Sequence, residues 1–269
     1  LETPGHVRFD NYKYDLNYYK DYMINWMENY GNHCQTSLFY ENHDNPRMIS
    51  KVDPDPIFRE VLAKLLAVMQ LTLRGTPFIY QGQELGMVNK NFTSIGEIHD
   101  VESINLYAKL RKTMDEKDAF KKVLAGTRDH ARTPMQWTNG KYAGFSDTEP
   151  WINGKDRDND YEICNAASQV SCKCSVWNFY RKLISLRKAH TALIYGNIKI
   201  VNKKKKNLFT YYRIGECETF YIECNLSRRA IKRKGKLPDG VRLVSNYSKV
   251  SVLQLRPYEA AVWLIKEAK

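Results

Sequence analysis

The chain has 269 residues, 43% of them hydrophobic and 12% aromatic, a composition that can bury a core and excludes a disordered chain. Its net charge of +12 would suit a nucleic-acid binder. However, the longest basic run, Lys203 to Lys206, lies between two strand-like segments, and a second cluster, 228–236, also reads as a loop, so we expect solvated turns and no nucleic-acid partner.

The first half of the chain shows the order strand, helix, strand. Residues 36–40 form a short apolar run, typical of a buried strand, which ends in the polar residues 41–44. Asp55 is a suitable N-cap and Pro56 a suitable first helical residue, and residues 57–73 then carry apolar side chains at helical spacing.

Gly75 can end this helix, and a second apolar run, 78–80, follows and ends in Q-G-Q-E at 81–84. The pattern predicts a βαβ unit with polar groups at one rim of a parallel sheet. In a (β/α)8 barrel, this rim is where the chemistry takes place.

After residue 100, the chain is predicted to form further helices and then a series of short strands. Residues 100–124 are expected to be a charged helix, 129–160 a long structured loop, and 175–190 an amphipathic helix. Short β-type stretches separated by turn residues then predict an antiparallel β-domain; they are 196–202, 207–214, 217–226, 241–246, 250–255 and 258–265. We therefore expect two domains, 1–192 and 193–269.

Six cysteines are present, and Cys172 and Cys174 form a C-x-C pair without a second pair or histidine at zinc spacing. We expect reduced thiols in the cytoplasm, with no metal and no cofactor, and keep a redox or metal role for Cys172 and Cys174 as the less favoured alternative. No run approaches the roughly 18 apolar residues of a membrane span, and no signal-peptide pattern is present. Because the chain begins with Leu1, we expect the natural start of translation upstream.

The most informative polar cluster is Asn42-His43-Asp44 at the end of the first predicted strand. A carboxylate and an imidazole at the mouth of a strand can both bond sugar hydroxyls. The carboxylate can also stabilise the positive charge of an oxocarbenium-like transition state. Taken alone, however, the tripeptide fits a turn or a helix cap better than a sugar site.

The cluster belongs to a series of motifs in a fixed order. These are S-L-F-Y-E-N-H-D-N-P-R at 37–47, G-T-P-F-I-Y-Q-G-Q-E-L-G at 75–86, D-V-E at 100–102, R-D-H-A-R-T-P-M-Q-W at 128–137, A-G-F at 143–145 and L-R-P-Y-E-A at 255–260. Over nearly its whole length the chain thus resembles the α-amylase superfamily, glycoside hydrolase family 13, and within it the oligo-1,6-glucosidase and α-glucosidase group. The first two motifs match the ends of the seventh and eighth barrel strands.

The resemblance implies a fold and a set of roles. The fold is α/β plus β, the C-terminal part of a (β/α)8 barrel (about strands 7 and 8) followed by an antiparallel β-sandwich. Asp44 corresponds to the transition-state-stabilising carboxylate, His43 to a histidine that bonds the same sugar, and Arg132 to the arginine that anchors the terminal glucose. Asn45 and Glu102 fall where the family shapes the next sugar site.

Two further charged residues are expected to support the fold. Glu84 lies near a strand end and a glycine-rich turn, where a carboxylate usually accepts hydrogen bonds from backbone N–H groups. Arg47 is expected either to bridge the loop carboxylates or to form an ordinary salt bridge.

The nucleophile and the acid/base of a retaining glycosidase, which the family carries on its fourth and fifth barrel strands, have no counterpart in this chain. The nearest string to the nucleophile pattern G-[FV]-R-x-D runs from Gly240 to Val244, where valine replaces the aspartate. We expect the isolated chain to be inactive, and to be poorly soluble, partly molten or associated with the missing N-terminal half, because two strands cannot close a barrel.

We therefore favour the hypothesis that the chain is part of an exo-acting retaining α-glucosidase that cleaves α-1,6 or α-1,4 bonds of short oligosaccharides. One alternative is a non-catalytic relative that acts in assembly, like the heavy chains of amino-acid transporters, although the retained His43, Asp44 and Arg132 argue against it. Another is a relative of the trehalose-6-phosphate hydrolases or the sucrose isomerases, whose C-terminal halves are similar.

Overall fold

A computed structural model of the chain describes residues 3–31, 33–152, 160–233, 237–249 and 251–265. Parts of the predicted loop 129–160, of the basic cluster 228–236 and of the predicted strand 250–255 lie outside these ranges. Among the described residues, no helix is both long and apolar enough to cross a membrane.

The chain forms two compact units, each assembled from separate stretches of sequence. Unit 1 comprises Leu1–Tyr14, Tyr40–Asp55 and Ile79–Trp177. Unit 2 comprises Asp15–Phe39, Pro56–Phe78 and Asn178–Lys269. The proposed domains 1–192 and 193–269 stay a prediction.

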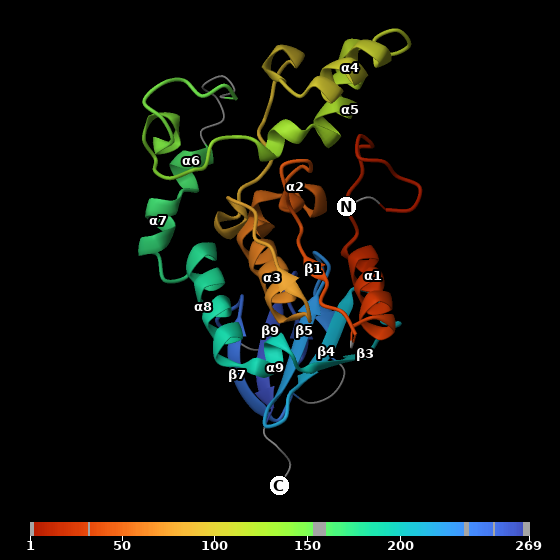
Figure 1. Ribbon diagram of the computed structural model, residues 1–269, viewed down its shortest axis with the longest axis vertical. Coiled ribbons are helices and arrows are strands. Elements are labelled where there is room, and N and C mark those ends of the chain that lie inside the picture. Colours follow the sequence, from red (N-terminus) through yellow and green to blue (C-terminus); the bar gives the residue numbers. More distant parts are fainter. Residues whose placement is uncertain (1–2, 32, 153–159, 234–236, 250, 266–269) are drawn as a thin grey trace. The chain divides into compact units, whose positions relative to one another are not determined.

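The α-helices are α1 (Leu16–Asn29), α2 (Met48–Val52), α3 (Arg59–Thr72), α4 (Val101–Leu110), α5 (Glu116–Gly126), α6 (Asp160–Ile163), α7 (Ala166–Ser171), α8 (Val176–Ala189) and α9 (Thr191–Ile194). The strands are β1 (Ser37–Leu38), β2 (Thr76–Pro77), β3 (Asn197–Val201), β4 (Leu208–Ile214), β5 (Thr219–Asn225), β6 (Ile231–Lys232), β7 (Gly240–Ser245), β8 (Gln254–Leu255) and β9 (Ala260–Ile265). Figure 1 labels most of these elements and colours the chain from red at the N-terminus to blue at the C-terminus.

The predicted order strand, helix, strand is confirmed in unit 2, where β1 and β2 pair in parallel and α3 lies between them in sequence. The second strand is shorter and earlier than predicted, because its ladder with β1 lies at Thr76 and Pro77 rather than at 78–80. Gln70 of α3 donates hydrogen bonds to the carbonyls of Leu38 and Phe78, at 2.9 and 2.7 Å, and so ties the helix to the end of both strands.

A five-stranded antiparallel sheet, in the order β3-β4-β5-β9-β7, forms the C-terminal part of unit 2. Its inner strands β4, β5 and β9 are nearly continuously buried, and α3 packs against β5 and β9. A second, two-stranded sheet pairs β6 with β8, so part of the predicted basic loop is a short strand. Gly240 to Val244, the weak nucleophile-like string, lies in β7 of the large sheet.

Two predicted helices need correction. The segment 100–124 forms two helices, α4 and α5, because Asp115 starts a new one by accepting a hydrogen bond from the backbone N–H of Asp118 at 3.0 Å. Helix α3 begins at Arg59, after a 3-10 turn at Pro56–Phe58, rather than at 57. Helices α1, α2, α6, α7 and α9 had no counterpart among the predicted helices.

Candidate functional site

The candidate site lies in unit 1 and is formed by the turn after β1 and by the segment 128–132. In the turn, the Asn42 side-chain oxygen accepts hydrogen bonds from the Asp44 backbone N–H at 2.9 Å and from the Asn45 side-chain amide at 2.8 Å. This local bonding fixes the backbone at Asp44, and it gives Asn45 a role in shaping the turn.

Asp44 is surrounded by cationic and imidazole groups. Its Oδ1 lies 3.2 Å from Arg132 Nη2 and 3.5 Å from Arg128 Nη1. Its Oδ2 lies 3.2 Å from His43 Nε2. The Arg132 Nε–H also donates to the His43 carbonyl at 2.9 Å, so Arg132 holds both the carboxylate and the backbone of the turn.

This cluster remains accessible. The Asp44 side chain is 45% exposed and the His43 side chain 70% exposed, whereas the two arginines are largely covered. An exposed carboxylate held by largely buried guanidinium groups can accept hydrogen bonds from a polar ligand without moving.

Glu102, at the start of α4, is joined to the same cluster by arginines. Its Oε2 forms an ion pair with Arg8 Nη2 and lies 4.0 Å from Arg128 Nη2. Arg8 Nη1–H also donates to the Asp44 carbonyl at 3.4 Å. The predicted residues His43, Asp44, Arg132 and Glu102 are thus brought together.

Arg128 is held by a buried carboxylate. Its Nε–H donates to Asp100 Oδ1 at 2.8 Å, and Ser103 Oγ–H donates to Asp100 Oδ2 at 2.7 Å. Burial alone would raise the pKa of Asp100, but these hydrogen bonds outweigh it and hold the pKa below its ordinary value. The hydrogen bond with Asp100 raises the pKa of Arg128, so both groups stay charged.

Arg128 and Arg8 were missed as site residues in the sequence. Arg128 stands in the R-D-H-A-R motif four residues before Arg132, and that spacing across a 3-10 turn was the available signal. Arg8 lies in an N-terminal segment without a motif, and no sequence signal pointed to it.

Arg47 and Glu84 lie apart from this cluster. Arg47 is fully buried, pairs with Glu41 at 2.9 Å and donates to the Gln81 carbonyl at 2.8 Å, so it links the loops that follow β1 and β2. Burial raises the pKa of Glu84, against backbone hydrogen bonds at Glu84 and Gly82 and the charge of Arg47. These contacts fit the supporting roles expected of both residues.

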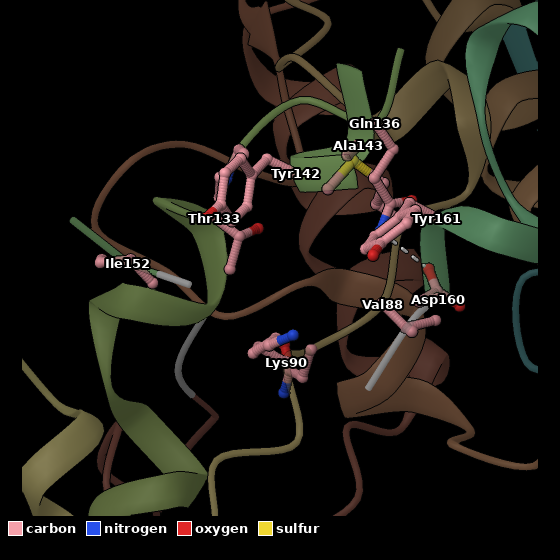
Figure 2. Close-up of a pocket in the computed structure, with 12 residues that line it drawn as sticks. Val88, Lys90, Thr133, Gln136, Tyr142, Ala143, Ile152, Asp160 and Tyr161 are labelled. Atoms are coloured by element: carbon pink, nitrogen blue, oxygen red, sulfur yellow. Dashed lines mark hydrogen bonds between the residues drawn. The ribbon is translucent and has the colours of Figure 1, made fainter. Parts of the chain in front are cut away.

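A small hollow lies beside Thr133, the residue after Arg132. Figure 2 shows its lining, in which the Gln136 side-chain amide donates to Asp160 Oδ2 at 3.1 Å. Tyr142 and Ala143, which line the hollow, have left-handed backbone conformations, with φ of 54° and 59°. Its lining does not include Asp44, His43 or Glu102.

Among the described residues, no group of three or more histidine, cysteine, aspartate or glutamate side chains could hold a metal ion. The candidate site offers a carboxylate, an imidazole and guanidinium groups. Such a set suits the recognition of hydroxyl-rich ligands and the stabilisation of a positively charged transition state.

Comparison with known proteins gives consistent results. Residues 2–196 match the family described as "Alpha amylase, catalytic domain". The trehalose-6-phosphate hydrolase of Escherichia coli (strain K12) is 36% identical over 273 residues, which cover 99% of this chain and 49% of that protein. The probable oligo-1,6-glucosidase 2 of Bacillus subtilis (strain 168) is 35% identical over 274 residues, with 98% and 48% covered.

The crystal structure of the Bacillus licheniformis trehalose-6-phosphate hydrolase superposes with a TM-score of 0.89 at 30% identity. It covers 98% of this chain and 49% of that one, so the chain spans about half the length of the relatives that it matches. The strands β1 and β2 are accordingly part of a TIM barrel, and the five-stranded sheet is the C-terminal β domain. Because the family model matches residues 2–196, most of the chain, the chain belongs to the α-amylase family, glycoside hydrolase family 13.

Proposed function

We propose that this chain is the C-terminal half of a retaining α-glucosidase. The whole enzyme would release terminal glucose from short oligosaccharides by cleaving α-1,6 or α-1,4 bonds. The observation that carries the proposal is the contact of Asp44 with Arg132 at 3.2 Å, with His43 on the other carboxylate oxygen. It supports a site in which the exposed carboxylate meets the sugar and the arginine anchors it.

In this proposal, Asp44 stabilises the oxocarbenium-like transition state through its negative charge. His43 and Arg132 bond hydroxyls of the terminal glucose, and Asn45 and Glu102 shape the adjacent sugar site. The nucleophile and the acid/base, which retaining enzymes hold about 5–5.5 Å apart, are proposed to lie in the remaining half of the protein, which would complete the barrel.

The test is hydrolysis of a chromogenic α-glucoside by the full-length protein, obtained from the upstream coding sequence. Asp44→Asn keeps the size of the side chain but removes its charge, so kcat should fall about a hundredfold or more. Glu116→Gln, an exposed carboxylate at the start of α5, is the matched control and should leave kcat unchanged. Full activity of the Asp44→Asn protein would overturn the role of Asp44.

A phosphorylated disaccharide is the second candidate substrate, and the 36% identity to the Escherichia coli trehalose-6-phosphate hydrolase favours it. A panel of isomaltose, maltose, sucrose and trehalose 6-phosphate separates the two by kcat/KM. If the full-length protein cleaves or isomerises none of these sugars, a non-catalytic role in assembly replaces the enzymatic proposal.

The proposed location is the cytoplasm, which the six cysteines, all present as thiols, fit. The proposed partners are an oligosaccharide and the N-terminal half of the barrel.

A further inference from the structure

The turn between α7 and α8 brings two thiols together outside the candidate glucose site. The sulfur atoms of Cys172 and Cys174 lie 3.2 Å apart, and both residues are exposed. Of the other cysteines, Cys34 and Cys217 are exposed, and Cys164 and Cys224 are buried.

Hydrogen bonds on both sides hold this turn in shape. The Ser175 backbone N–H donates to the Cys172 carbonyl at 3.1 Å, which closes a β-turn with both cysteines inside it. Before the turn, the Cys172 N–H donates to the Gln169 carbonyl at 3.3 Å. After it, the Ser175 hydroxyl donates to the same carbonyl at 2.7 Å.

Gln169 also ties the turn to the rest of unit 1. Its side-chain oxygen accepts from the Trp177 backbone N–H at 3.0 Å, and its side-chain amide donates to the Leu85 carbonyl at 2.7 Å. The folded turn therefore holds the two thiols together before any reaction begins. An unstructured chain would lose conformational entropy when it brought them together during the reaction.

The surroundings also favour attack by a thiolate. Lys173, exposed between the two cysteines, contributes a positive charge. The 14-residue helix α8 begins at Val176, two residues after Cys174, and its N-terminus carries a partial positive charge. Because both sulfurs are exposed, a small oxidant can reach either of them.

We propose that Cys172 and Cys174 form a reversible dithiol–disulfide site whose oxidant is a low-molecular-weight disulfide of the glutathione type. One cysteine thiolate attacks the oxidant, which forms a mixed disulfide and releases one small thiol. The second cysteine then attacks the protein sulfur of that mixed disulfide and releases the other small thiol. Two electrons and two protons pass from the cysteines to the two released thiols.

Since both cysteines lie in one turn, the disulfide crosslinks no second element. Oxidation therefore stays local, and the site acts by thiol–disulfide exchange rather than by moving the fold. It is independent of the proposed glucosidase activity.

The test equilibrates the full-length protein with mixtures of reduced and oxidised glutathione and then labels the remaining thiols by alkylation. Mass spectrometry of the peptide that carries both cysteines distinguishes the dithiol, the mixed disulfide and the internal disulfide. We expect the internal disulfide, in monomeric protein, with an equilibrium constant at least about tenfold higher in the native protein than in the protein unfolded by guanidinium.

Single-cysteine variants complete the design. Cys172→Ser and Cys174→Ser should each accumulate the mixed disulfide with glutathione, because the resolving thiol is gone. Cys217→Ser, which removes an exposed cysteine in a different turn, should behave as wild type. The proposal is overturned if the native wild-type peptide carries only separate mixed disulfides, or if the native equilibrium constant is no higher than that of the unfolded chain; neither readout depends on the variants folding.

Discussion

At the scale of single residues, burial decides the charge of His130. This side chain is 3% exposed, and its Nε2 lies 2.8 Å from the Leu124 carbonyl. Desolvation, with a smaller effect from the charge of Arg47, lowers the pKa of His130 to about 4. Between pH of about 6.5 and about 4, the unfolded chain binds a proton that the folded chain does not, so stability falls as the pH drops through this window.

His130→Asn should therefore reduce the acid sensitivity of the protein. The full effect in the wild type is about 3 kcal/mol, from the difference between the two pKa values. The measurement is the urea midpoint at pH 7 and at pH 5, and the drop between them should be smaller in the variant. His33→Asn, an exposed histidine, is the control and should keep the wild-type drop; an equal drop in all three proteins would contradict the assignment.

At the scale of elements, two buried arginines fix the C-terminal end of α3 in unit 2. Arg187 donates to the carbonyls of Leu71, Leu73 and Gly75 at 2.9, 3.2 and 2.6 Å. Both Arg187 and Arg213 donate to the Leu193 carbonyl, at 2.7 and 2.8 Å. The last carbonyls of a helix have no partner within the helix and carry partial negative charge, which explains why cations are buried here.

Removing one of these cations should therefore destabilise unit 2 strongly. Arg187→Met leaves buried carbonyls without a donor, and we expect a loss of about 3 kcal/mol or more in the free energy of unfolding. Lys188→Met, on the exposed side of the same helix, should change it by less than about 0.5 kcal/mol. Urea denaturation followed by circular dichroism measures both, and equal stability of the two variants would show that the arginine contacts contribute little.

At the scale of the whole molecule, β1 and β2 are the only barrel strands of this chain among the described residues. Phe39 and Phe78, next to these strands, are exposed. Open strand edges and exposed aromatic rings favour association with another chain.

The chain expressed alone should therefore melt over a broad temperature range, bind a hydrophobic dye and associate on size exclusion, and it should not hydrolyse a chromogenic α-glucoside. Co-expression with the upstream half should sharpen the transition and reduce dye binding. A sharp cooperative melt of the purified monomer would contradict this, and so would turnover that persists after contaminating glucosidases are removed.

The sequence by itself determined the family, the βαβ order and the antiparallel C-terminal strands. Each of these follows from local patterns in the sequence. They are polar residues after an apolar run, helical spacing over 57–73, and turn residues between short β-type stretches. It did not predict α1, or the division of 100–124 into α4 and α5, because helix ends there depend on single caps such as Asp115.

Only the tertiary structure decided what surrounds Asp44. His43 is its neighbour in sequence, but Arg132 lies 88 residues away and Arg8 36 residues away, and both reach it through the fold. Burial likewise settled the charge state of His130. The spacing of the Cys172 and Cys174 sulfurs was settled by hydrogen bonds that the Gln169 carbonyl accepts and that Ser175 donates. Periodicity and motifs report the preferences of neighbouring residues, whereas long-range contacts and desolvation arise only when distant segments pack.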